Sequence, residues 1–251
     1  MLHFQPQASL ATGQVEAVEA LVRWNHPEHG LLYPDRFLPL AEQTDVIDRL
    51  TDWVLHTALA TLRSLDASSS RKLKVAVNVS ARSVCRSDFA RRVIDKLHSL
   101  DMAPGRLIVE VTETALLTDP ARAAKVLQEL STAGVEISID DFGQGQTSLA
   151  YLSALPVDEL KIDKSFVMDM LQHPAHAAIA RSIIDLAHNL QLRVVGEGVE
   201  SEEILDALHT AGCDIAQGFL LARPMAPDLL VEWLLAEDSK ATSERSHLAL
   251  T

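Results

Sequence analysis

The chain has 251 residues, of which 47% are hydrophobic, and its 22 basic and 35 acidic residues give a net charge of −13. That length suits a single β/α barrel, and the acidic balance argues against binding long nucleic acid, whose affinity depends on neutralising phosphates. No apolar run approaches the ~20 residues of a membrane span, and no signal peptide is visible at the N-terminus. We therefore expect a cytoplasmic domain without membrane insertion of its own, either free or as the cytoplasmic part of a larger membrane-bound protein.

Short β-rich segments alternate with helical patterns along most of the chain. The expected strands are Leu2–Gln5, Val15–Arg23, Lys74–Asn78, Leu107–Val111, Glu136–Asp140, Glu159–Asp163, Arg193–Glu197 and Asp214–Gly218. The expected helices are Ile47–Leu65, Phe89–Leu100, Pro120–Ala133, Ala175–Leu190 and Ser201–Ala211. Eight strands separated by helical crossovers predict an α/β fold with a closed, mainly parallel barrel.

The first connection breaks this pattern. Only a short segment around ASLATGQ separates the first two strands, whereas a parallel crossover needs a dozen residues or more. We therefore expect a hairpin turned near Thr12 and Gly13, and a TIM-like (β/α)8 barrel whose first strand is antiparallel to the rest. The barrel is expected to span residues 1–237. The segment 238–251 (DSKATSERSHLALT) lacks apolar periodicity and is expected to be a flexible C-terminal tail.

Most of the expected strands carry a charged or amide side chain at or near the C-terminal end. These residues are Glu19, Asn78, Glu110, Glu113, Asp140, Asp141, Lys161, Glu197 and Gln217. In a barrel such ends meet at one mouth, where active sites are built. A single acid there is more often a solvated rim residue or half of an ion pair, but six or more polar residues on different strands favour a functional site. Because several buried carboxylates need cations, and oxygen ligands suit Mg²⁺ or Mn²⁺, we expect a metal site.

The adjacent carboxylates of Asp140 and Asp141 add a specific indication. Two acids in sequence can serve different cations or bridge a metal pair, and such a pair clamps a phosphoryl group and activates a water molecule. Lys161 on the following strand could orient that water or stabilise charge in the transition state. Taken alone, a structural salt bridge to a neighbouring aspartate is the commoner role for such a lysine.

These residues belong to a longer ordered series of motifs. The series is Phe4–Pro6 (FQP), Glu19–Leu21 (EAL), Phe37–Glu42 (FLPLAE), Asn78–Ala81 (NVSA), Glu110–Glu113 (EVTE), Asp140–Leu152 (DDFGQGQTSLAYL), Lys161–Val167 (KIDKSFV), Gly196–Glu200 (GEGVE) and Gln217–Pro224 (QGFLLARP). Any one motif is weak by itself. In this order, and over nearly the whole chain, the series closely resembles the EAL-domain family of cyclic-di-GMP phosphodiesterases.

The resemblance implies a barrel that hydrolyses one phosphodiester bond of cyclic-di-GMP and releases linear pGpG. It implies two divalent cations, Mg²⁺ or Mn²⁺, and a Ca²⁺ form that binds without turnover. The metal ligands it implies are Glu19, Asn78, Glu110, Asp140 and Asp141, and the catalytic residues are Lys161, which contacts the attacking water, and Glu197. The substrate contacts it implies are Gln5, Leu21 and Arg23, and the supporting residues are Glu113, Glu200 and Gln217. It also implies a homodimer and an upstream sensory or GGDEF domain in a longer protein.

The chain departs from the family in the loop that follows the paired aspartates. Gln144, Gln146 and Thr147 stand where the family usually has Thr, Tyr and Ser, which affects the expected rate and dimer coupling more than the chemistry. Two alternative functions stay open. One is a non-catalytic cyclic-di-GMP receptor, although such receptors usually lack some metal ligands and none is missing here. The other is a barrel that stabilises an enolate with Mg²⁺, against which Asn78, the paired aspartates and the FQP segment argue.

Overall fold

The computed structural model of the chain describes residues 1–68, 72–144 and 148–248. Its centre is a closed barrel of eight strands in the order β1-β10-β9-β8-β7-β6-β5-β2. Their bounds are β1 (Leu2–Ser9), β2 (Val15–Val22), β5 (Lys74–Asn78), β6 (Leu107–Thr112), β7 (Glu136–Phe142), β8 (Glu159–Ile162), β9 (Arg193–Glu197) and β10 (Ile215–Gln217). Each of these strands overlaps one of the eight that the sequence predicts.

The strand β1 runs antiparallel to both of its neighbours, β2 and β10, whereas the other neighbouring pairs are parallel. The β1–β2 hairpin turns at Gly13, which has a φ of +67° and donates from its backbone N–H to Ser9 O at 2.8 Å. A left-handed backbone of this kind is the conformation that glycine adopts without a steric penalty. The predicted TIM-like barrel with a reversed first strand is therefore confirmed.

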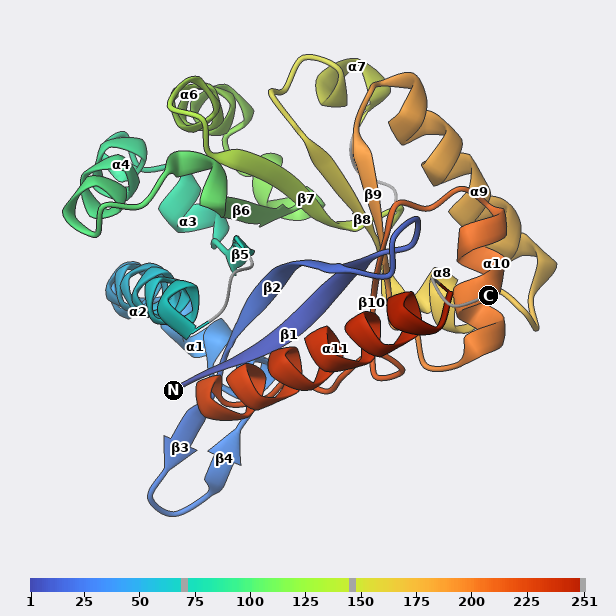
Figure 1. The fold of residues 1–251 in the computed structure, drawn as a ribbon. Coiled ribbons are helices and arrows are strands. Elements are labelled where there is room, and N and C mark those ends of the chain that lie inside the picture. Colours follow the sequence, from blue (N-terminus) through green and yellow to red (C-terminus); the bar gives the residue numbers. More distant parts are fainter. Residues whose placement is uncertain (69–71, 145–147, 249–251) are drawn as a thin grey trace.

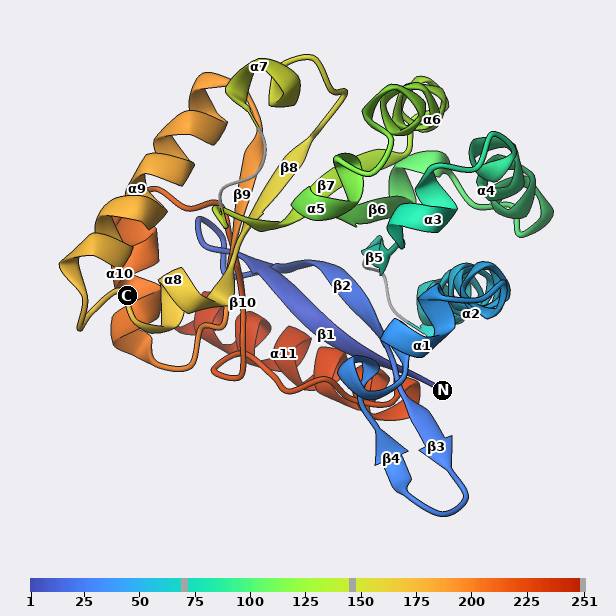
Figure 2. The same cartoon turned by 180° about the vertical axis from the view of Figure 1, so that it is seen from behind.

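Helices cover the outside of the barrel (Figure 1, Figure 2). The long ones are α2 (Val46–Ser68), α4 (Phe89–Ser99), α6 (Pro120–Thr132), α9 (Pro174–Asn189), α10 (Glu202–Thr210) and α11 (Pro227–Leu248). The sequence predicts the first five. In α9 the buried residues Ala180, Ile183, Ile184 and Ala187 recur at helical spacing, so one apolar stripe faces the strands. None of the described helices is long and apolar enough to cross a membrane.

Shorter elements, which the sequence analysis did not predict, stand mainly where the barrel strands end. They are α1 (Leu38–Glu42), α3 (Ala81–Val84), α5 (Glu113–Leu116), α7 (Leu149–Leu152) and α8 (Lys164–Met168). Directly after β2 the chain forms a small antiparallel hairpin of β3 (Trp24–His26) and β4 (Gly30–Leu32), which projects from the barrel in Figure 1. A turn of 3₁₀ helix, η1 (Pro34–Arg36), follows it.

The last helix, α11, packs against β1 and buries Leu230 and Leu234. Its backbone stays helical to Leu248, past the limit at residue 237 where the sequence analysis ended the barrel domain. Regular structure therefore runs through most of the segment that we expected to be a tail. The domain limit itself stays a prediction, and residues 249–251 lie outside the described part of the chain.

The inside of the barrel is layered, because alternate residues of each strand face inward. At the N-terminal ends of the strands, Glu136 accepts from Lys74 Nζ at 2.6 Å and from Arg193 Nη2 at 2.8 Å. On β2, β5 and β6, Ala17, Ala76 and Ile108 form a separate apolar cluster. Two residues further along the same three strands come Glu19, Asn78 and Glu110, which are expected at the mouth. The ionic and apolar layers thus close the barrel floor and leave the functional layer open to one side.

Candidate active site

One ammonium group lies among four carboxylates at the C-terminal ends of the barrel strands. Lys161 Nζ lies 2.7 Å from Glu197 Oε1 and 3.0 Å from Glu110 Oε1. Asp140 Oδ1 and Glu19 Oε2 lie 3.4 and 3.5 Å from the same nitrogen. The Lys161 side chain is fully buried, and its four partners come from β2, β6, β7 and β9. The convergence that the sequence predicts is present.

Two side-chain amides fix the carboxylate of Glu19. Asn78 Nδ2 donates to Glu19 Oε1 at 2.6 Å and to Glu110 Oε2 at 3.0 Å. Gln217 Nε2 donates to Glu19 Oε2 at 2.6 Å. Because both oxygens of Glu19 accept a hydrogen bond, its carboxylate has one well-defined orientation at the mouth. A ligand role for Asn78 requires its amide to turn over, since a metal binds the carbonyl oxygen and not the nitrogen.

A bulge in β7 brings Asp140 and Asp141 into the same cluster. Neighbouring residues of a regular strand point to opposite faces, but the register of β7 against β8 shifts between Ile139 and Phe142. Asp141 also adopts a φ of +53°, a left-handed conformation that is often found at functional sites. One carboxylate oxygen each from Asp140, Asp141 and Glu197 consequently lies within 4.8 Å of the others.

The cluster holds more negative charge than Lys161 can balance. Burial raises the pKa of Glu197 to about 8. Burial and the charge of Glu19 raise the pKa of Glu110 well above its usual range, and burial and the charge of Asp140 raise the pKa of Asp141 to about 6. Without further cations, part of this cluster retains protons at neutral pH.

Glu19 shows the opposite shift. Burial alone would raise its pKa, but the Lys161 ammonium and the hydrogen bonds from Gln217 and Asn78 lower it below the usual value. Lys161 itself is held charged, because its four carboxylate contacts outweigh the desolvation that would lower its pKa and instead raise it. Glu19 and Lys161 therefore form a fixed ion pair inside a region that is otherwise too acidic.

The donor set fits a hard divalent cation. All of the converging side chains other than Lys161 offer oxygen, which is the ligand atom that Mg²⁺ and Mn²⁺ prefer. Glu110 Oε1 is buried, has no hydrogen-bond partner among the described residues, and lies 3.0 Å from the Lys161 ammonium. A cation would offset the surplus charge and displace the protons that the raised pKa values retain. The described residues thus include an acidic cluster that could bind metal.

The cluster opens into a cavity of about 730 Å³, a size typical of small-molecule sites. The side chains from the cluster that line it are Glu19, Asp140, Glu197 and Gln217, and the others expected to act there are Gln5, Leu21, Arg23 and Glu200. Gln5 is held in place because its Nε2 donates to Ala222 O at 3.1 Å and its Oε1 accepts from Gln217. Glu113 is buried at the start of α5 and is not part of the cavity wall that the described residues form.

Asp163, which lies two residues after Lys161, was not predicted from the sequence as a site residue. Asp163 accepts from Gln144 Nε2 at 3.0 Å and from Ser165 N at 2.9 Å, and its carboxyl group hydrogen-bonds with that of Asp141. Asp163 could have been predicted from its place just past the end of β8, because polar residues at the ends of the other strands were already expected to be site residues. Gln144, one of the three loop departures, is thus tied to the carboxylate beside the cluster, whereas Gln146 and Thr147 lie outside the described residues.

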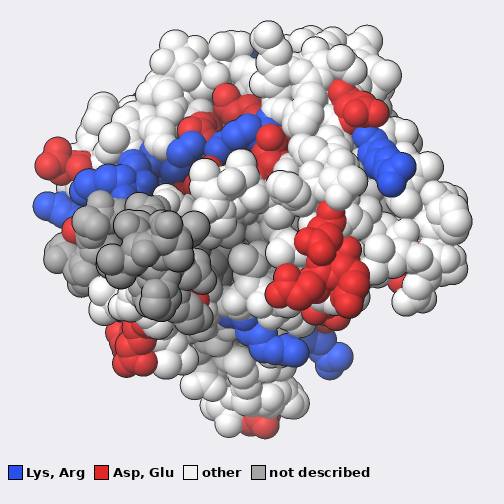
Figure 3. Space-filling model, turned by 45° about the vertical axis from the view of Figure 1, so that its right-hand side comes forward, with Lys and Arg blue, Asp and Glu red and all other residues white. Residues whose placement is uncertain are grey.

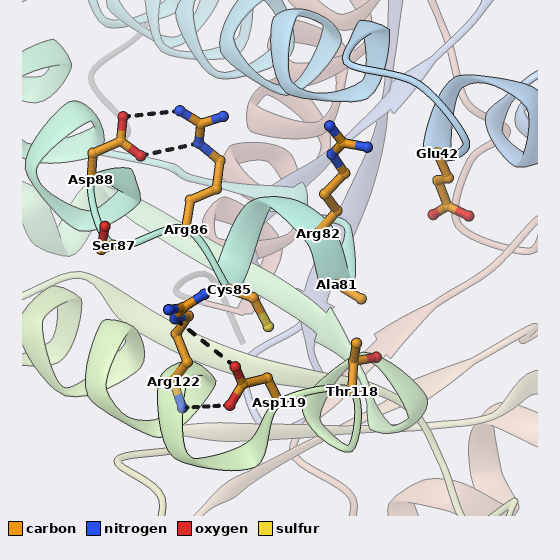
Figure 4. A pocket seen from close by; sticks show the side chains of 10 residues that line it. All are labelled: Glu42, Ala81, Arg82, Cys85, Arg86, Ser87, Asp88, Thr118, Asp119 and Arg122. Atoms are coloured by element: carbon orange, nitrogen blue, oxygen red, sulfur yellow. Dashed lines mark hydrogen bonds and ion pairs between the residues drawn. The ribbon is translucent and has the colours of Figure 1, made fainter.

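A second cavity, of about 770 Å³, lies beside α3 and the start of α6 (Figure 4). Three arginines line it, but Arg86 is bound to Asp88 at 3.0 Å, Arg122 lies 3.9 Å from Asp119, and Arg82 pairs with Asp45. The charges there are balanced, so the lining does not define an anion site. On the face shown in Figure 3, a band of basic side chains and two smaller basic groups lie beside acidic ones.

The closed barrel and the oxygen-rich cluster at the C-terminal ends of its strands place the protein in the class of β/α barrels that could bind a metal at the mouth. The family model for the EAL domain matches residues 1–224, so the chain belongs to the EAL-domain family. It is 45% identical over 235 residues to the cyclic di-GMP phosphodiesterase NbdA of Pseudomonas aeruginosa. This match covers 94% of this chain and 30% of NbdA. It is 41% identical to the bifunctional diguanylate cyclase/cyclic di-GMP phosphodiesterase MucR of the same species, over 92% of this chain and 34% of that protein.

Solved structures of the family share the barrel. The P. aeruginosa MucR phosphodiesterase in complex with c-di-GMP has a TM-score of 0.87 and 42% identity, and the match covers 92% of this chain and 93% of that one. The EAL enzyme Bd1971 in its cAMP- and cyclic-di-GMP-bound form has a TM-score of 0.89 and 33% identity, over 93% of this chain and 64% of that one. The chain spans about a third of the length of NbdA and MucR.

Proposed function

We propose that the chain is a metal-dependent phosphodiesterase that hydrolyses one phosphodiester bond of cyclic-di-GMP and releases linear pGpG. The observation that carries this proposal is the buried carboxylate cluster around Lys161, which opens into a cavity large enough for a small ligand. The names of NbdA and MucR, and the ligand named for the MucR structure, support the choice of substrate.

The roles that we propose follow the positions of the side chains. Two divalent cations, Mg²⁺ or Mn²⁺, would neutralise the phosphate and lower the pKa of a water molecule. The residues proposed to hold one of them are Glu19, Asn78, Glu110 and Asp140, and those proposed to hold the other are Asp140 and Asp141, with Glu197 beside it. Asp140 is shared by both sets, as its position between Lys161 and Asp141 allows.

Lys161 is proposed to orient the attacking water and to stabilise charge that develops on the phosphate. Its ammonium carries three N–H donors and is held by carboxylates on several sides. A donor whose position is fixed before the reaction stabilises the transition state without a cost of reorganisation. Glu197, at 2.7 Å, holds the ammonium on the side of the cavity and is the second residue to which we assign a catalytic role.

The substrate contacts are assigned to residues of β1 and β2. Gln5, Leu21 and Arg23 all line the cavity. A guanidinium group can donate two parallel hydrogen bonds to a phosphate, and Arg23 is proposed to hold the dinucleotide in this way. Glu113, Glu200 and Gln217 are proposed to support the loops and ligands around them.

The test is direct. The purified chain is incubated with cyclic-di-GMP and Mg²⁺ or Mn²⁺, and the products are separated by chromatography. We expect pGpG with either cation, no product after chelation, and binding without product when Ca²⁺ replaces the activating ion. Binding without product in Mg²⁺ and Mn²⁺ would make the chain a receptor, and failure to bind cyclic-di-GMP would overturn the proposal.

We also propose that the domain acts in the cytoplasm, as a homodimer, and together with an upstream sensory or GGDEF domain. The chain matches only about a third of the length of NbdA and MucR, and MucR is named as bifunctional. Both observations support the proposal that the domain is part of a larger protein. Light scattering of the purified chain at increasing concentration tests the dimer, and a monomer at all concentrations would contradict it.

A further inference from the structure

The backbone of Arg23 is clamped beside the cavity. Arg23 N donates to Met1 O at 2.9 Å, and the Met1 ammonium donates to Arg23 O at 2.9 Å. The side chain is only 6% exposed and lines the cavity. Nη1 donates to Val22 O at 2.9 Å, while Nε is buried and has no hydrogen-bond partner among the described residues. A buried donor without a partner next to a cavity indicates a ligand that is hydrogen-bonded there.

One aromatic ring lies against this guanidinium group. The Arg23 guanidinium carbon lies 4.9 Å from the centre of the Tyr33 ring, which is within the range of a cation–π contact. Tyr33 lines the same cavity, although its side chain is 56% exposed. The hydrogen bond from Nη1 goes to the carbonyl of the preceding residue, so the ring of Tyr33 supplies a contact from a separate segment of the chain.

The local sequence fixes the position of this ring. Tyr33 follows β4 and precedes Pro34, and a residue before proline is restricted to extended backbone. Its φ of −89° and ψ of 160° agree with that restriction. The β3–β4 hairpin returns the chain toward the point where it left β2, directly after Arg23. The short hairpin and Pro34 therefore place the ring of Tyr33 against the guanidinium group of Arg23.

We infer that Tyr33 is a positioning residue, which holds the Arg23 guanidinium in the orientation that receives a phosphate of the substrate. This inference rests on the proposed function. An arginine side chain loses considerable rotamer freedom when it binds, and a stacked ring removes part of that freedom in advance. Because the guanidinium covers a face of the ring, Tyr33 acts on the substrate through Arg23.

The experiment compares Tyr33→Leu with Tyr33→Phe in steady-state hydrolysis of cyclic-di-GMP with Mn²⁺. Loss of the ring should raise KM by about tenfold with kcat unchanged, which is the size and pattern expected when a cation–π contact to a binding group is lost. Tyr33→Phe keeps the ring and should keep KM within about twofold of the wild type. Leu31→Ala is the matched control, because Leu31 lies on the same hairpin, is exposed, and is not among the described residues of the cavity wall.

A double-mutant cycle separates this role from a direct contact with the substrate. In the Arg23→Ala background, Tyr33→Leu should cause no further change, because the group it positions is gone. Independent effects of the two changes would overturn the inference, and so would an equal loss in Tyr33→Phe and Tyr33→Leu. The unfolding temperature of the Tyr33 variants should stay at the wild-type value, which excludes a merely structural cause.

Wild-type behaviour distinguishes failure of this inference from failure of the proposed function. If wild type hydrolyses cyclic-di-GMP and Tyr33→Leu matches it, only the inference falls. If wild type binds cyclic-di-GMP without hydrolysing it, calorimetry in Ca²⁺ measures the dissociation constants of the wild type and the Tyr33 variants. The inference then requires the same variant-to-wild-type ratios in these constants as those expected for KM, and equal constants would overturn it. If wild type neither binds nor hydrolyses cyclic-di-GMP, both are overturned.

Discussion

Lys161 Nζ lies 2.7 Å from Glu197 Oε1, and the two residues come from neighbouring parallel strands. In the ladder between β8 and β9, Lys161 pairs with Val195, two residues before Glu197. The contact is therefore set by the register of the sheet, and it persists as long as the barrel is intact. A salt bridge built in this way fixes the position of the ammonium group. The surrounding carboxylates in turn depend on that ammonium to balance part of their charge.

Lys161→Ala should lower kcat for cyclic-di-GMP by at least about 100-fold, the loss seen when one fixed donor to a developing charge is removed. The structure adds a second effect. Without metal, the variant should lose about 3–5 kcal/mol of stability, because a buried charge partner of several carboxylates is gone. Added Mn²⁺ should restore much of that stability but not the rate.

Kinetics and thermal unfolding with and without Mn²⁺ measure both effects of Lys161→Ala. Lys125→Ala serves as the control, since Lys125 is an exposed lysine on the outer helix α6. Turnover by Lys161→Ala at the wild-type rate would exclude the catalytic role that we assign to this lysine.

Gln217→Leu should weaken metal binding without removing a ligand. Gln217 Nε2 donates to Glu19 Oε2 at 2.6 Å and so orients a carboxylate that we assign to the first cation. Loss of a hydrogen bond of this kind typically lowers metal affinity by about 10–100-fold. The concentration of Mn²⁺ that gives half-maximal activity should rise accordingly, with kcat at saturating Mn²⁺ much less affected. An unchanged metal dependence would show that Gln217 does not orient Glu19 for metal binding.

The metal-free protein should lose stability as the pH rises. The pKa of Glu197 is raised from 4.5 to about 8 in the folded state. Between these values the folded chain binds more protons than the unfolded chain, so the contribution is complete below pH 4.5 and is lost as the pH rises through 8. A cation requires the ionised carboxylates, and its stabilising effect should therefore grow from pH 6 to pH 8.

Thermal unfolding across this pH range, with chelator and with Mn²⁺, measures the dependence. Glu197→Gln should flatten the metal-free curve, because the group that titrates is removed. Glu129→Gln changes an exposed acid on the outer helix α6 and should leave the curve unaltered. A Glu197→Gln curve as steep as that of the wild type would contradict the assignment.

Gly218→Ala should destabilise the barrel by about 1–3 kcal/mol or more, as overpacking does. A Cβ at position 218 would lie 2.0 Å from Val199 O and 2.3 Å from Val199 N, and backbone atoms cannot move aside as a flexible side chain can. Because Gly218 follows Gln217, metal affinity should fall as well. Gly105→Ala is the control, since its Cβ would meet only Gly134 O at 3.6 Å. Denaturant unfolding of both variants measures the difference, and equal stabilities would show that the backbone adjusts.

The sequence was sufficient for the barrel because its signals are local and repeated. Apolar strands, helical spacing and the short link before Val15 predicted eight strands and the reversed β1. The strand ends also predicted that Glu19, Glu110, Asp140, Lys161 and Glu197 lie at one mouth, since parallel strands in a barrel end at one face, but not that the carboxylates surround the lysine. The β3–β4 hairpin was missed because its strands have three residues each, too few for a periodic pattern.

Other features depend on contacts that no local pattern encodes. The bulge that turns Asp141 toward Asp140 appears only in the pairing of β7 with β8. Asp163 could be placed near the mouth from its position after β8, but its contact with Asp141 is made across two strands and no local pattern encodes it. The ring of Tyr33 reaches Arg23 only because an unpredicted hairpin folds back beside β2.

The direction of β1 has a practical consequence for anyone who labels this protein. In a barrel of parallel strands only, the first residue would lie on the face away from the catalytic mouth. Here the amino group of Met1 is bonded to Arg23 O, and His3 belongs to the cavity wall. A fluorophore or purification tag attached at residue 1 of this chain would therefore start beside the rim where cyclic-di-GMP is expected to enter. An upstream domain would be joined at the same place, so tagged and untagged protein should be compared before any rate is interpreted.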